Sequence, residues 1–197
     1  LRQLRARLSS AMVAAGFTET INYSFVAEED LARAGAPVDR LVRLANPLSR
    51  GQSVMRTSML PGILANARQN QNFSAADFAL FEIGKIYFAP PPAEEKNDEE
   101  AEAAGIPDPR VPAGLPPAAI EQTWLIAALS EVLPLTWKSG GRAADFFDMK
   151  GAAEALIEAL GRRRARVEPA ADVAHLHPGR AAALDRKSTR LNSSHDQ

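Results

Sequence analysis

The side chains best suited to metal chemistry lie near the carboxyl end of the chain. His175 and His177, in HLHPGR, could ligate a metal ion through their imidazole nitrogens. The chain has no cysteine, and no third ligand stands at a usable spacing. We therefore favour a turn shaped by His177 and Pro178, with Arg180 pairing with a carboxylate or reaching a partner surface.

Arginines supply the other candidate binding groups. Arg56, in VMRTS, could bind a phosphate or a carboxylate, although a structural ion pair within the core or at a subunit boundary is the favoured role. The run at residues 162–166, RRRAR, could contact RNA, but basic residues after a helix C-terminus more often compensate the helix dipole in solvent. Asp148 and Lys150 are expected to cap and solvate a helix start.

The sequence motifs of independent enzymes are missing. The chain contains no phosphate-binding loop, G-x-G-x-x-G, H-E-x-x-H or G-x-S-x-G sequence. These absences argue against several common nucleotide-binding and hydrolytic sites. The elements that position the candidate residues must therefore be considered before any function is assigned.

Hydrophobic periodicity predicts a mixture of helices and strands. Helices are predicted at residues 1–15, 28–34, 58–72 and 148–160, and strands at 18–25, 41–44, 78–88, 123–130 and within 175–184. Most strands follow one another or single helices, with no repeated strand–helix–strand unit. This order favours an α+β domain built around an antiparallel sheet flanked by helices.

Two of the predicted strands differ in their expected burial. In the strand at 18–25, alternation predicts that Phe17, Ile21, Tyr23 and Phe25 share one buried face. The strand at 78–88 is apolar on both faces and should lie centrally in the sheet, where Glu82 would need a partner.

The helix at 58–72 has a clear start and a predicted buried side. Ser58 can accept a hydrogen bond from the first-turn amides, and Pro61 stands early enough to cost no helical hydrogen bond. The predicted buried stripe comprises Leu60, Ile63, Leu64 and Ala67. The preceding strand, at 41–44, is expected to end in a turn at Asn46 and Pro47.

Composition indicates an ordinary globular domain. The chain has 197 residues, a hydrophobic content of 46% and a net charge of −1 with the two signs mixed. That balance gives no electrostatic argument for a nucleic-acid-binding domain as a whole. No apolar run approaches the about 20 residues that cross a bilayer, and the opening LRQLRARLSS is charged, so we expect a soluble cytoplasmic protein.

Two segments are expected to lie outside the packed core. Residues 90–122 are rich in proline and acidic groups and are interpreted as an exposed insertion. Residues 185–197, which include DRKSTRLNSSH, resemble the translation of a common sequencing adaptor and are expected to be a non-native tail. The core domain is therefore assigned to residues 1–184, and the chain, which opens without methionine, is expected to be a piece of a longer protein.

Four segments in a fixed order carry a family resemblance. They are GFTETINYSFV from Gly16, NPLSRGQSVMRTSMLPGILANARQN from Asn46, FALFEIGKIYF from Phe78, and FFDMKGAAEALIEALG from Phe146 with LHPGRAA after it. This series resembles the beta subunit of bacterial phenylalanine–tRNA ligase, in its region folded like a class II aminoacyl-tRNA synthetase core. The resemblance covers most of residues 1–184.

The resemblance implies a partner and a surface that meets it. In class II synthetases the first motif is a helix that leads into a strand and forms the dimer interface; here these are the helix at 1–15 and the strand at 18–25. The helix, with Leu1, Leu4 and Leu8, is thus a candidate contact with the alpha subunit, in a heterotetramer of two alpha and two beta subunits. Packing of the same helix on its own sheet is an equally weighted alternative.

The resemblance also implies a noncatalytic copy of the fold. Active relatives carry arginines on the second-motif strand and its loop, because the triphosphate and the adenylate transition state require fixed positive charge. Here Lys85 could supply one charge, but Phe88 stands where those relatives carry arginine. The third motif is not found. No catalytic, cofactor or metal residue is therefore assigned, and ATP, Mg²⁺ and phenylalanine are expected to bind the alpha subunit.

The residues expected to serve structure or interface are collected from these interpretations: Leu1, Leu4, Leu8, Asn46, Pro47, Arg56, Pro61, Glu82, Gly84, His177, Pro178 and Arg180. Two alternatives stay open. One is a tRNA-binding module without an assembly role, which predicts salt-sensitive binding through residues 162–166. The other is an independent class II-like ligase.

Overall fold

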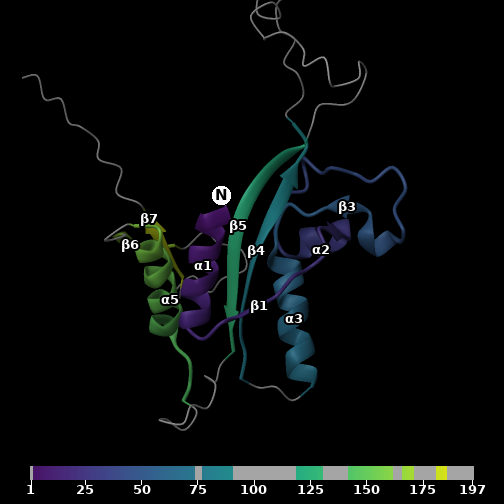
Figure 1. Ribbon diagram of the computed structural model, residues 1–197. Helices are drawn as coiled ribbons and strands as arrows, with labels where there is room; N and C mark the ends of the chain where they lie inside the picture. The colour runs from purple at the N-terminus through teal and green to yellow at the C-terminus, as the bar shows by residue number, and fades with distance from the viewer. Residues whose placement is uncertain are drawn as a thin grey trace, which may run out of the picture. The chain divides into compact units, whose positions relative to one another are not determined.

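The computed structural model describes residues 2–73, 77–90, 119–130, 142–161, 166–170 and 181–185 (Figure 1). Its helices are α1 (Arg2–Ala14), α2 (Glu28–Arg33), α3 (Leu60–Asn72) and α5 (Phe146–Ala159), with a 3₁₀ turn at Arg50–Gln52. Its strands are β1 (Thr18–Glu19), β2 (Phe25–Val26), β3 (Val54–Met55), β4 (Ala79–Phe88), β5 (Ile120–Leu129), β6 (Arg166–Pro169) and β7 (Ala182–Asp185). None of the described helices is long and apolar enough to cross a membrane.

The chain divides into two compact units. The first comprises Leu1–Asn22, Gly62–Ile83 and Leu125–Gln197, and the second comprises Tyr23–Pro61 and Gly84–Trp124. Strands β4 and β5 each contribute one part to each unit.

The core of the first unit lies between β4 and the pair of helices α1 and α5, which pack side by side (Figure 1). Phe81 on β4 is fully buried, and Met12 of α1 and Ala152 of α5 lie in the same cluster. Burial of large apolar side chains supplies the main stabilising term for such a core. The consecutive residues 79–83 of β4 are all buried, although their side chains point alternately to the two faces. The strand is therefore covered on both faces there, as its sequence predicts.

Strand directions combine one parallel pair with antiparallel pairs. β1 pairs with β4 in parallel, with Thr18 opposite Leu80, and the three-stranded sheet has the order β1-β4-β5. Phe78, just before β4, exchanges hydrogen bonds with Ser130, just after β5, while Lys85 meets Glu121 nearer the opposite ends, so β4 and β5 are antiparallel. β6 and β7 form a separate antiparallel pair.

The second unit is organised around another antiparallel pair. β2 pairs with β3, with Phe25 opposite Met55 and Val26 opposite Val54. Val54 and Leu31 of α2 are fully buried. In place of the strand predicted at 41–44, the described residues there form a single bridge, between Arg43 and Val54. Two backbone hydrogen bonds flank this bridge, from the Leu44 amide to the Ser53 carbonyl at 3.0 Å and from the Met55 amide to the Val42 carbonyl at 2.9 Å.

Helix boundaries follow the local signals. The Ser58 hydroxyl accepts a hydrogen bond from the Leu60 amide at 3.1 Å, which confirms the predicted start of α3. Gly35 and Gly161, after α2 and α5, adopt φ angles of 65° and 75°, the left-handed conformation that glycine adopts without strain. The predicted burial of Leu64 on α3 is wrong, because that side chain is 51% exposed whereas Ile63 is buried.

The predicted face of the segment at 17–25 is also wrong beyond its first residue. Phe17 is buried, but Ile21 and Tyr23 are 88% and 77% exposed, and Phe25 is 39% exposed. The intervening Asn22 and Ser24 are partly buried instead. Only the two ends of the segment, β1 and β2, form strands.

A pair of substitutions tests this inverted burial. Phe81→Ala should lower the free energy of unfolding by about 3 to 5 kcal/mol, because it opens a cavity around a fully buried side chain. Ile21→Ala should change it by less than about 0.5 kcal/mol, because Ile21 is largely exposed. Urea denaturation measures both values. A cost for Ile21→Ala similar to that for Phe81→Ala would show that Ile21 is buried.

Candidate functional site

Lys85, the cation of β4, is paired with a residue of the neighbouring strand β5. Its ammonium forms an ion pair with the Glu121 carboxylate of β5, and both side chains are about half exposed. The hydrogen bond from Lys85 to Glu121, together with the charge of that carboxylate, raises the pKa of Lys85 above its ordinary value. The positive charge that could attract a phosphate is therefore offset by an adjacent negative charge.

A second cation lies at the position of Phe88. The Arg40 guanidinium carbon lies 5.8 Å from the centroid of the Phe88 ring. Arg40 also donates from Nε and Nη2 to the Ala89 carbonyl oxygen, at 2.8 and 2.6 Å. Sequence reasoning missed Arg40, because nothing in its local sequence indicates contact with a residue 49 positions away. These contacts hold the end of β4.

Arg56 joins the strands of the second unit. The side chain is 3% exposed, and its Nε donates to the Lys85 carbonyl oxygen at 2.9 Å. Its amide donates to the Ser24 carbonyl at 2.8 Å, and its own carbonyl accepts from the Tyr87 amide at 2.9 Å. These contacts suit the structural role favoured from the sequence better than an exposed anion site.

The contacts of Lys85 and Arg40 do not form a phosphate-binding site. Among the described residues of β4 and β5, the charge of Lys85 is offset by that of Glu121. Phe88 is covered by Arg40, which itself donates to the Ala89 carbonyl. Stabilisation of a triphosphate needs donors directed at the place where the phosphate charge develops. We therefore assign no step of adenylate chemistry to this hairpin.

Glu82 has the partner that its burial requires. The side chain is 2% exposed, and its Oε2 accepts a hydrogen bond from Asn22 Nδ2 at 2.8 Å. Two positions earlier, Thr20 donates from its amide and its hydroxyl to the Phe81 carbonyl oxygen, at 2.7 and 3.3 Å. Polar side chains of the segment before β2 thus face the strand β4, which the sequence did not predict.

The same contacts leave an apolar side chain in solvent. Ile21 lies between Thr20 and Asn22, and successive side chains of an extended chain point to opposite sides. Ile21 is 88% exposed, far more than a core strand residue. Its aliphatic surface is therefore accessible to a partner.

Of the two described leucines in the predicted α1 stripe, Leu8 is in the core and Leu4 is partly in solvent. Leu8 packs against the core cluster that contains Met12, whereas Leu4 is 41% exposed. Arg5 and Ser9 bond to the Glu19 carboxylate, at 3.2 and 3.0 Å. The alternative in which α1 packs on its own unit therefore accounts for Leu8, and Leu4 stays available for an interface.

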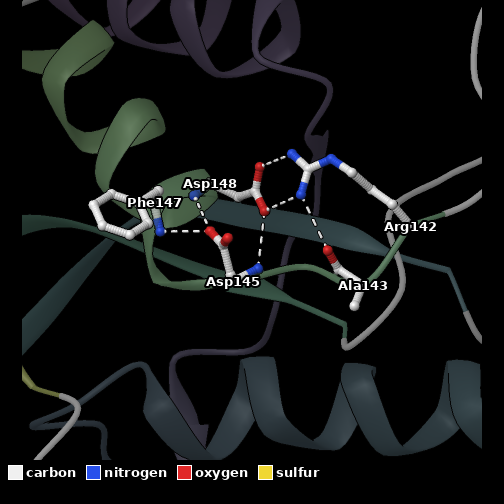
Figure 2. A network of polar contacts seen from close by, with 5 residues as sticks. All are labelled: Arg142, Ala143, Asp145, Phe147 and Asp148. Carbon is white, nitrogen blue, oxygen red and sulfur yellow. Dashed lines mark hydrogen bonds and ion pairs between the residues drawn. The ribbon is translucent and has the colours of Figure 1, made fainter.

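The start of α5 is held by a network of carboxylates (Figure 2). Asp145 is the N-cap, and its carboxylate accepts from the amides of Phe147 and Asp148. The Asp148 carboxylate accepts in return from the Asp145 amide at 2.9 Å and pairs with Arg142. The expected capping role of Asp148 is therefore corrected: it stands in the first turn and closes a capping box with Asp145.

The remaining predicted residues have varied positions. Asn46 and Pro47 are exposed at a bend, Pro61 is partly buried in the first turn of α3, and Gly84 is partly buried within β4. Arg166 opens β6, and residues 162–165 lie outside the described part of the chain, so the expected role of this basic run stays a prediction. Leu1, His175, His177, Pro178 and Arg180 also lie outside it. Within the described ranges, no group of three or more His, Asp or Glu residues could hold a metal ion.

Comparison with protein families gives a match over nearly the whole chain. The family model described as phenylalanyl tRNA synthetase beta chain CLM domain matches residues 1–191. A phenylalanine–tRNA ligase beta subunit of Anaeromyxobacter dehalogenans is 36% identical over 92% of this chain and 20% of that protein. The corresponding subunit of Aromatoleum aromaticum is 37% identical over 88% and 19%. The chain thus spans about a fifth of the length of these relatives.

Solved structures show the fold. A pyrrolysyl-tRNA synthetase of Desulfitobacterium hafniense matches with a TM-score of 0.55 and 17% identity, over 87% of this chain and 50% of that one. A second structure of a pyrrolysyl-tRNA synthetase from the same organism gives a TM-score of 0.56 and 16% identity. The predicted synthetase-like α+β fold is confirmed, and the parallel pairing of β1 with β4 is a detail that the sequence did not predict.

The α5 cap predicts a pH dependence. The hydrogen bonds from Arg142 and from the Asp145 amide, with the charge of Arg142, hold the pKa of Asp148 below its ordinary value. A carboxyl whose folded-state pKa is depressed adds stability that is fully present above its unfolded pKa, about 3.9, and is lost as the pH falls through the lower folded value. Wild-type chain should therefore lose stability over that interval, whereas Asp148→Asn should show a lower and flatter profile.

Thermal unfolding followed by circular dichroism between about pH 6 and pH 2 measures this difference. Glu158→Gln is the matched control, because it removes an exposed carboxylate at the opposite end of α5. It should keep the wild-type dependence on pH. Parallel profiles for wild type and Asp148→Asn would show that the Arg142–Asp148 pair does not stabilise the helix start.

Proposed function

The chain belongs to the family of phenylalanyl-tRNA synthetase beta chain CLM domains, and we propose that it is the synthetase-like assembly module of a phenylalanine–tRNA ligase beta subunit. In this proposal the module docks the alpha subunit and performs no adenylate chemistry itself. The whole enzyme joins phenylalanine to its tRNA with ATP. The assembly is proposed to be a cytoplasmic heterotetramer of two alpha and two beta subunits.

One observation carries the docking proposal. The segment between β1 and β2 directs polar side chains toward β4 and leaves Ile21 exposed in the first unit, with Tyr23 exposed in the second. A largely exposed isoleucine gains free energy when a partner covers it, by about 25 cal/mol for each Å² removed from water. The alpha subunit is the partner proposed to cover Ile21, because the relatives are named as beta subunits.

The hairpin of β4 and β5 supports the assignment of catalysis to the partner. Lys85 and Arg40 are engaged by Glu121 and by the Ala89 carbonyl, so their positive charges serve contacts within the chain. We propose that ATP, Mg²⁺ and phenylalanine bind the alpha subunit, and that tRNA binds the complete complex.

The predicted effect of a charge at Ile21 tests the docking proposal. Affinity-tagged chain should capture the purified alpha subunit of Anaeromyxobacter dehalogenans, the organism of one relative. Ile21→Glu should weaken capture by roughly tenfold or more, because a carboxylate would be desolvated in an apolar contact. Dissociation constants measured by biolayer interferometry give the comparison.

Two further variants locate the surface. Leu64→Glu is the matched control, since Leu64 is also an exposed aliphatic residue of the first unit, on α3, and its substitution should leave the affinity unchanged. Leu4→Glu tests α1: a loss of affinity alongside Ile21→Glu extends the interface to the helix. Undiminished capture by Ile21→Glu would remove the segment from the interface, and failure of the wild-type chain to capture alpha would contradict the docking role.

The alternative of an independent ligase has its own test. Chain without alpha subunit should show no exchange of pyrophosphate into ATP in the presence of phenylalanine and Mg²⁺. Exchange above that of a chain carrying Lys85→Ala would support the alternative, because Lys85 is the cation that the hairpin could offer to a phosphate.

A further inference from the structure

The hydrogen bond between Asn22 and Glu82 lies next to the exposed Ile21 and can fix its orientation. We propose that Asn22, held by Glu82 and seated against Gly62, positions Ile21 for the alpha subunit. This inference rests on the proposed function and extends it, because it assigns the residues that orient residues 20–22, which are proposed to dock the alpha subunit. All four residues belong to the first unit.

The contact with Glu82 fixes which side of the segment faces inward. Asn22 Nδ2 donates to Glu82 Oε2 at 2.8 Å, and Glu82 is 2% exposed. A hydrogen bond to a buried carboxylate is charge-assisted and is stronger than one between neutral groups. Asn22 is thereby held toward β4, so its neighbour Ile21 is directed to solvent.

The backbone of the segment is held at the preceding residue. The Thr20 amide donates to the Phe81 carbonyl at 2.7 Å, one residue from Glu82 along β4. Thr20 and Asn22 thus bind consecutive residues of the same strand. Two anchors on either side of Ile21 fix the direction of its side chain more tightly than one anchor could.

Gly62 supplies the room that Asn22 occupies. A Cβ atom placed on Gly62 would lie 3.1 Å from Asn22 Cγ, 3.2 Å from its Cβ and 3.3 Å from its Nδ2. These distances are shorter than ordinary carbon contacts, so a side chain at position 62 would displace Asn22 by a few tenths of an ångström. Glycine is also a poor helix former, so its presence in the first turn of α3 is accounted for by this close approach.

The chemistry requires a donor at position 22. A carboxylate accepts hydrogen bonds only, so Asn22→Asp would set two acceptors against each other. Adding Glu82→Gln supplies a new donor, because the glutamine amide can then donate to the carboxylate introduced at position 22, the original contact with its polarity reversed. The double variant should therefore rescue what the single variant loses.

The absence of cysteine from the chain permits a direct measurement. Ile21→Cys adds a unique thiol for a nitroxide label, whose rotational mobility is recorded by electron paramagnetic resonance. Asn22→Asp in this background should increase the mobility of the label, and Asn22→Asp with Glu82→Gln should restore it. The same substitutions with Ile21 intact should weaken capture of alpha by roughly tenfold and restore it to within about twofold.

Gly62→Ala separates positioning from general stability. Alanine favours the helix, which offsets part of the cost of displacing Asn22, so label mobility should rise and capture should weaken by more than the change in melting temperature accounts for. A purely structural role for the contact predicts that affinity follows the melting temperature in every variant. If Asn22→Asp does not fold, Gly62→Ala and Asn22→Ala provide the same comparison.

The outcomes distinguish this inference from the function on which it rests. Unchanged label mobility in folded Asn22→Asp and Gly62→Ala chains would overturn the positioning role, whatever their affinity for alpha. Increased mobility with unchanged capture would also overturn it, because the orientation of residue 21 would then not govern docking. If wild-type chain failed to capture alpha while the mobility changes occurred as expected, the docking function would fail and the local contact of Asn22 would stand.

Discussion

The conformation of residues 20–22 depends on the hydrogen bonds by which Thr20 and Asn22 hold them to β4. Polar groups that face a strand must find partners there, because an unpaired buried group costs more than its hydrogen bond would contribute. The Phe81 carbonyl and the Glu82 carboxylate satisfy that requirement. Once these contacts form, the Ile21 side chain points away from β4, because successive side chains of an extended chain point to opposite sides. Its exposure follows from that direction.

The basic side chains of the second unit also bind groups within the chain. Arg56 and Arg40 donate to backbone carbonyl oxygens, Arg40 also lies over the Phe88 ring, and Lys85 pairs with Glu121. A cation committed in this way stabilises strands and turns, and it would have to break those contacts to grip a phosphate. The fold of a synthetase is thus compatible with a protein whose cations hold the chain together.

The sequence predicted the features that local rules decide. Ser58 marked the start of α3, the apolar residues on both faces of β4 marked a covered strand, and burial of Glu82 required a partner. The first two depend on spacing within a few residues, whereas the need of a buried carboxylate for a partner follows from its chemistry and does not identify Asn22. The four ordered segments also identified the family, which the match over residues 1–191 confirms.

The remaining features depend on residues that are distant in the chain. Alternation at 17–25 separates two sets of side chains, but it does not say which set faces inward; Phe81 and Glu82, about 60 positions away, decide that. The contact of Arg40 with Phe88 and Ala89 has the same origin. At α5, both Asp145 and Asp148 satisfy the composition of a cap, and only the geometry assigns Asp145 to the N-cap.

The most direct test of the central claim is amide hydrogen exchange of the chain, followed by mass spectrometry, with and without the alpha subunit. Docking through Ile21 predicts that peptides covering residues 20–26 become protected when alpha binds, while peptides covering the exposed face of α3 around Leu64 exchange as before. Binding of alpha with protection confined to α3, or with none at residues 20–26, would contradict it.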